Sequence, residues 1–161
     1  MKTPAILRWL PLAAFCFLIS QQTGAEESGG DGGSGADAQD STGFVVIVNK
    51  SNTETSLSRD RIAKLFLKKA TVWNDKSAVK PVDQSSKSET RKTFSSDVLK
   101  MSVDAVLRYW QQMVFSGRGS PPPIKNSDAA VIEYVKANPG AIGYVSKKAD
   151  TSGVAVVTVT D

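Results

Sequence analysis

The chain has 161 residues, with 20 basic and 16 acidic side chains, no histidine, one cysteine and 40% apolar residues. This length and composition predict one soluble domain. Without histidine the chain has no Ser-His-Asp or Cys-His nucleophile and no histidine-bearing zinc site, and a lone cysteine excludes an intramolecular disulfide and a thiolate metal cluster.

The first 25 residues have the pattern of a secretory signal peptide. Two basic residues, Lys2 and Arg8, precede an apolar run at 9–19, and small residues follow at 23–25. Such a leader is removed on export. The apolar run is shorter than the roughly 20 residues that cross a bilayer, so we expect no membrane-spanning segment after cleavage. The predicted location is the periplasm or the cell exterior.

The segment that follows, 26–42, is predicted to be a disordered Gly/Ser/Asp-rich tether. It carries five acidic side chains and no large apolar one, so it cannot bury enough surface to offset the entropy lost on ordering. The folded domain is therefore expected at 43–161, where 18 basic and 11 acidic residues give a net charge of +7. A basic domain either favours an anionic partner or simply has a solvated lysine-rich surface.

The first half of the domain predicts a strand, a helix and a second strand. The apolar, β-branched run 44–48 predicts a strand covered on both faces. Ser58 is a good N-cap for a helix over 58–68, and a short strand is expected at 79–82. A second helix is predicted over 86–99.

The second half continues the alternation. Ser102 caps the helix with the clearest 3.6-residue period, whose apolar positions are expected in the core. These positions are Val103, Val106, Leu107, Trp110, Met113 and Val114. An irregular, partly extended loop follows at 117–123. Ser127 caps a short helix that stops at 138–140, and strands are expected at 141–145 and 154–159. The sum is an α/β domain whose sheet has about four or five strands, with helices on its faces.

The stretch 83–91 is the best candidate for a binding site, because it runs from a predicted strand into the start of a predicted helix. An exposed helix N-terminus carries unpaired N–H groups and a partial positive charge, and it binds anions readily. Ser86, Ser88 and Thr90 add hydroxyl groups, and Arg91 adds a planar guanidinium that matches two oxygens of an oxyanion. The predicted anion-binding residues are therefore these four.

A second interpretation of the same residues is purely structural. The spacing from Ser86 to Glu89 satisfies the S-x-x-E capping box, in which the two side chains accept hydrogen bonds from the donors at the start of the helix itself. Composition favours capping over anion binding at this point.

Other chemistries have little support in the sequence. There is no phosphate-loop or dinucleotide-binding motif, the acidic residues form no dyad or metal cage, and the basic residues form no stripe interleaved with exposed aromatics. We therefore expect neither an enzyme, a cofactor, a metal site nor a nucleic-acid partner.

The domain resembles the phosphate-binding, type 2 periplasmic solute-binding proteins of ABC transporters over about 44–159. The segments that carry the resemblance are 44–49, 57–66, 73–75 and 138–145, the last of which reads Asn-Pro-Gly-Ala-Ile-Gly-Tyr-Val. In that family a G-S-G-T-R-like turn at a helix start holds the phosphate oxygens. The run Ser88-Glu89-Thr90-Arg91-Lys92-Thr93-Phe94 is similar to the continuation of that motif into the helix.

The resemblance implies a periplasmic-binding-protein-like domain with a mixed sheet and helices on both faces. It also implies anion contacts by Ser88, Thr90 and Arg91, with phosphate as the ligand and ABC transporter membrane subunits as partners. Two departures stand out: Glu89 occupies the position of a family glycine, and the chain has room for one lobe where the family closes two around the ligand. The alternative is an envelope interaction module that keeps the scaffold and binds no ligand.

Overall fold

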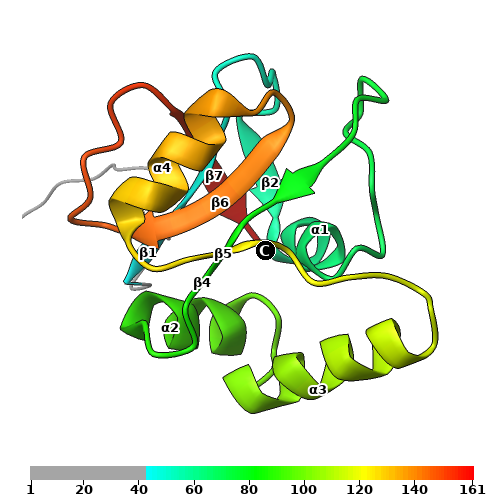
Figure 1. Ribbon diagram of the computed structural model, residues 1–161. Helices are drawn as coiled ribbons and strands as arrows, with labels where there is room; N and C mark the ends of the chain where they lie inside the picture. Colours follow the sequence, from blue (N-terminus) through cyan, green and yellow to red (C-terminus); the bar gives the residue numbers. More distant parts are fainter. Residues whose placement is uncertain (1–42) are drawn as a thin grey trace, which may run out of the picture. The chain divides into compact units, whose positions relative to one another are not determined.

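The computed structural model describes residues 43–161, so the predictions for 1–25 and 26–42 lie outside the described residues. A mixed five-stranded sheet, in the order β2-β7-β1-β6-β3, forms the centre of this part of the chain (Figure 1). Its strands are β1 (Phe44–Val48), β2 (Ser56–Ser58), β3 (Lys80–Pro81), β6 (Ala141–Ser146) and β7 (Ala155–Thr160). The central strand β1 pairs antiparallel with β6 and β7, whereas the outer strands β2 and β3 pair parallel with their neighbours.

Helices cover both faces of this sheet, as predicted. The four helices are α1 (Arg59–Phe66), α2 (Glu89–Asp97), α3 (Val103–Phe115) and α4 (Asp128–Ala137). On one face Phe44 and Val46 pack in a core cluster with Phe94 of α2 and residues of α1 and α3. On the other face Ile47 packs with Val131 and other residues of α4. Because alternate side chains of β1 enter opposite clusters, the uninterrupted apolar run of this strand is explained.

The strand expected at 79–82 forms as β3 along the large sheet, and the chain then continues directly into a second sheet. Val82 donates its backbone N–H to Ile142 of β6 at 2.9 Å, but the next N–H, of Asp83, donates to Pro123 at 2.9 Å. The chain thereby leaves the large sheet and forms β4 (Asp83–Gln84), which pairs parallel with β5 (Ile124–Lys125) in a separate two-stranded sheet. This small sheet was not predicted, because the partner of β4 lies some forty residues further along the chain.

The predicted helix starts at Ser58, Ser102 and Ser127 are confirmed, since each serine caps a helix by accepting a backbone N–H three residues further on. The prediction of a helix over 86–99 is too long at both ends. Its N-cap is Ser88, which has an extended backbone (φ −71°, ψ 131°). The predicted capping box from Ser86 to Glu89 is therefore wrong, because Ser88 and not Ser86 caps the helix.

Helix α3 buries less of its apolar surface than its periodicity predicts. Val106 and Trp110 are buried, but Leu107 and Val114 are 40% and 53% exposed. The terminal Phe115 is 91% exposed. The expected core position of Leu107 and Val114 is thus wrong, because α3 packs through one side only within the described residues.

The stop after α4 takes the form predicted from its Asn-Pro-Gly sequence. Gly140 has φ +79°, and a Cβ atom built there would lie 2.3 Å from the carbonyl oxygen of Ala78. The indole N–H of Trp73 donates to the Gly140 carbonyl at 2.9 Å. Only glycine fits this left-handed turn, which returns the chain directly into β6.

Candidate functional site

The start of α2 is built around the Ser88 hydroxyl. Its oxygen accepts the backbone N–H of Arg91 at 3.3 Å, and its hydrogen is donated to Gln84 Oε1 at 2.6 Å. One serine thus caps α2 and ties it to β4. Within the described residues, the backbone N–H groups of Glu89 and Thr90 have no protein acceptor, so the first turn of α2 still offers two donors.

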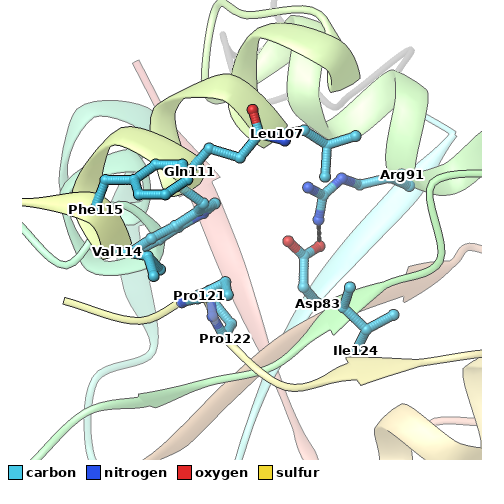
Figure 2. A pocket seen from close by; sticks show the side chains of 10 residues that line it. Asp83, Arg91, Leu107, Gln111, Val114, Phe115, Pro121, Pro122 and Ile124 are labelled. Carbon is cyan, nitrogen blue, oxygen red and sulfur yellow. Dashed lines mark ion pairs between the residues drawn. The ribbon is translucent and has the colours of Figure 1, made fainter.

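Arg91 points into the protein and not toward an anion at the tip of α2. Its side chain is 4% exposed, and its guanidinium forms an ion pair with Asp83 at the end of strand β4. Its Nη1 atom also donates to the hydroxyl oxygen of Tyr144, in β6, at 3.4 Å. Figure 2 shows the guanidinium facing the Asp83 carboxylate, with the ion pair drawn as a dashed line. The buried arginine is thereby neutralised by the protein's own carboxylate.

Asp83 is held by three donors that come from three elements. Its Oδ1 atom accepts from Arg91, from the Tyr144 hydroxyl and from the backbone N–H of Gln84, the last at 2.9 Å. The side-chain amide of Gln84 in turn donates to Asp128 at 2.8 Å and to the Tyr144 carbonyl at 2.9 Å. This network joins β4, α2, β6 and α4, and it makes the position of each polar group depend on the others.

Burial shifts the pKa of both Arg91 and Tyr144. Desolvation raises the pKa of Tyr144 to about 12, and the nearby Arg91 charge opposes part of that rise. Desolvation lowers the pKa of Arg91, and the interaction with Tyr144 opposes part of that fall. The Tyr144 ring stacks on Phe94 at 3.8 Å between centroids. At neutral pH the tyrosine is therefore a neutral donor to Asp83, and the guanidinium stays charged.

The four predicted anion-binding residues are only partly brought together. Ser88 and Arg91 join one network, in which both side chains are already engaged by the protein. Ser86 is exposed and lines a hollow of about 660 Å³ between α2 and α3, which Lys92 also lines. Thr90 is half-buried in the first turn of α2. Anion binding by these residues stays a prediction.

Sequence reasoning missed Asp83, Gln84 and Tyr144 as members of this network. A tyrosine within the apolar strand 141–145 was a usable signal, because a buried hydroxyl needs a partner. The partner of this hydroxyl could not be predicted from local sequence patterns, because Asp83 lies 61 residues away along the chain.

A mainly apolar pocket of about 370 Å³ lies beside the Asp83–Arg91 pair (Figure 2). Helix α3 supplies one wall, and the segment leading into β5 supplies another. Its principal apolar lining residues are Leu107, Trp110, Val114, Pro121, Pro122 and Ile124. The ion pair is the charged part of its lining.

Neither a metal centre nor a membrane span is found within residues 43–161. No group of three or more potential metal-ligating side chains occurs among these described residues. No helix in the same range is both long and apolar enough to cross a bilayer.

The fold is shared with structures of phosphate receptors. An ABC-type phosphate transport receptor from Vibrio cholerae matches with 20% identity and a TM-score of 0.58, over 74% of this chain and 47% of that one. A putative phosphate ABC transporter substrate-binding protein from Clostridium perfringens, solved with bound phosphate, matches with 21% identity and a TM-score of 0.57, over 73% and 44%.

A possible phosphate binding protein from Planctomyces limnophilus matches with 16% identity and a TM-score of 0.55, over 74% and 42%. This chain therefore spans less than half the length of each of these proteins. No curated protein sequence matches the chain. A family model described as the PBP superfamily domain matches residues 41–158. The sheet order, the helices on both faces and this match together show that the chain belongs to the PBP superfamily domain family.

Proposed function

We propose that the protein is an exported, non-catalytic solute-binding protein that binds phosphate or a related oxyanion in connection with ABC-type phosphate uptake. The observation that carries this proposal is the start of α2, where the N–H groups of Glu89 and Thr90 have no acceptor among the described residues and Ser86, three residues before Glu89, is exposed. The likeness to proteins named as phosphate receptors supports phosphate as the first ligand to test. The leader-like N-terminal sequence supports the periplasm or cell exterior as the location.

Electrostatics at this helix start predict weak binding. The Arg91 charge is already balanced by Asp83, and Glu89 places an exposed carboxylate in the first turn. An oxyanion at the tip would therefore rely on backbone N–H groups, the hydroxyls of Ser86 and Thr90, and the helix dipole. Contact with Arg91 would require its guanidinium to separate from Asp83. We expect a low affinity that falls further as salt is added.

Isothermal calorimetry on the full chain with phosphate and with sulfate tests this proposal. Wild type should release heat on phosphate addition, and Ser86→Ala and Thr90→Val should each weaken binding. Lys50→Ala, an exposed site after β1, is the control, because it removes one positive charge from the domain away from α2. The absence of any binding isotherm for wild type would dispose of the proposal, while equal affinity in Arg91→Ala would show that the guanidinium stays with Asp83.

A second function, an envelope interaction module without a ligand, is favoured by the exposed apolar face of α3. Val114 and Phe115 are 53% and 91% exposed at the end of this helix. Exposed apolar clusters mark sites of protein association. An envelope-protein partner that Ser86→Ala retains and Phe115→Ser loses in affinity purification would support this function, and equal recovery by both variants would contradict it.

A further inference from the structure

Exposed apolar surface is concentrated at one place in the described part of the chain. Six large apolar side chains in residues 43–161 are exposed, and four of them line the pocket beside α3. These four are Leu107, Val114, Phe115 and Ile124. Scattered apolar residues on a surface are ordinary, but a cluster around a hollow is typical of a binding site. The cluster combines residues of two separate elements, α3 and β5, so it is the tertiary structure that brings these side chains together.

The floor of this pocket has unused hydrogen-bonding capacity. All the hydrogen bonds and ion-pair contacts that Asp83 makes among the described residues involve its Oδ1 atom, and Figure 2 shows the second carboxylate oxygen facing into the pocket. The Nε–H group of Arg91 also lacks a partner in the same part of the chain, but it is buried and does not open to the pocket. The free Asp83 oxygen is open to solvent, so a group that displaces its water binds well only if it supplies a hydrogen-bond donor of its own.

The floor also determines which charge the bound group can carry. The guanidinium and the carboxylate balance each other, so a free anion entering the pocket would lose its hydration and meet the Asp83 oxygen. An ammonium would find an acceptor in Asp83, but it too would lose its hydration, and the Arg91 charge beside it would repel it. An uncharged group with an apolar body and one hydrogen-bond donor at its tip has neither penalty.

The rim indicates that the bound group belongs to a polypeptide. Phe115 is almost fully exposed at the end of α3, and a small molecule confined to the pocket would leave most of its ring in water. A polypeptide covers both the rim and the pocket, and tyrosine and tryptophan are enriched among the residues that anchor such contacts. The flat rings of Pro121 and Pro122 line the pocket next to Val114, which suits an aromatic ring.

We propose that this pocket binds a partner polypeptide through a tyrosine or tryptophan side chain whose O–H or N–H donates to the free oxygen of Asp83. The ring packs between α3 and the proline segment, and Phe115 covers the flanking surface of the partner. This inference rests on the interaction function above, to which it adds the chemistry of the partner. It does not depend on phosphate binding at the start of α2.

The test is an NMR titration of the isotope-labelled full chain with N-acetyltyrosinamide and N-acetylphenylalaninamide, which differ by one hydroxyl. We expect chemical-shift changes over α3 and 121–124, and affinity for the tyrosine compound about tenfold or more above that for the phenylalanine compound, because only the former satisfies Asp83. Val114→Ser, a half-exposed site that folding tolerates, should weaken both. Lys50→Ala should weaken neither.

Several results would overturn the proposal. Equal affinity for the two compounds would remove the role of Asp83, and shift changes elsewhere would remove the pocket. Sedimentation showing that wild type is a dimer dissociated by Phe115→Ser would assign the surface to a second copy of this chain. Oxyanion binding is tested separately, by calorimetry with phosphate. A negative NMR titration would therefore refute the pocket proposal without bearing on the proposal of oxyanion binding.

Discussion

The buried pair of Asp83 and Arg91 makes a prediction that can be worked through in free energy. Both residues are at most 5% exposed, and removing one partner of such a pair leaves an uncompensated buried charge. Asp83→Asn should cost about 3–5 kcal/mol of unfolding free energy, because the buried guanidinium then faces only neutral oxygens and has no countercharge. Arg91→Met should lie near the lower end of that range, since Asp83 retains donors from Tyr144 and Gln84.

The double variant, Asp83→Asn with Arg91→Met, should cost much less than the two single losses together. We expect a coupling free energy of about 2 kcal/mol or more, because neither buried charge remains to be left unpaired. Urea unfolding followed by the fluorescence of the buried Trp73 and Trp110 measures each variant.

An exposed pair on the same helix provides the matched control for this cycle. Glu89 and Lys92 form an ion pair at 2.7 Å across three residues of α2, with both side chains more than half exposed. The same cycle with Glu89→Gln and Lys92→Met should give a coupling below about 0.5 kcal/mol. A coupling for Asp83 and Arg91 no larger than that of the exposed pair would refute the reasoning, because burial would then have no effect on the interaction.

Two further predictions concern the same network. Because burial raises the pKa of Tyr144 from 10 to about 12, the unfolded state loses this proton first, and wild type should lose up to about 2–3 kcal/mol of unfolding free energy as the pH rises through that window. Tyr144→Phe should lack this pH-dependent loss when the urea midpoint is measured against pH. Parallel curves for wild type and the variant would contradict the prediction. Ser88→Ala should cost about 1 kcal/mol or more through loss of the α2 cap, whereas Ser86→Ala should stay within about 0.5 kcal/mol. Thermal or urea unfolding measures the stability of both variants. Equal losses of stability would contradict the assignment of Ser88 as the N-cap of α2.

Local signals in the sequence predicted much of the fold. The runs at 44–48 and 141–145 become strands because their apolar, β-branched side chains suit a sheet covered on both faces. Ser102 and Ser127 cap helices because a serine oxygen reaches an N–H three residues ahead. Each of these outcomes depends on neighbours within a few residues, so the sequence contains them.

The candidate site was only partly predictable for the opposite reason. The position of Arg91 at a helix start is a local fact, but its direction depends on Asp83 and Tyr144, which other strands bring to it. Likewise the period of α3 marks Leu107 and Val114 as apolar without showing whether another element covers them. Periodicity shows which side of one helix is apolar. Burial of that side also requires another element that packs against it.

The sequence by itself therefore determined the approximate places of the four described helices and of the long strands β1, β6 and β7, the starts of three helices, and that the domain is α/β with a positive net charge. Tertiary structure alone decided that the guanidinium of Arg91 turns inward, that the chain continues from β3 directly into a second sheet, and that α3 keeps an exposed apolar face. The physical reason is that hydrogen bonds and burial between distant segments are settled by chain topology, which local propensity does not contain.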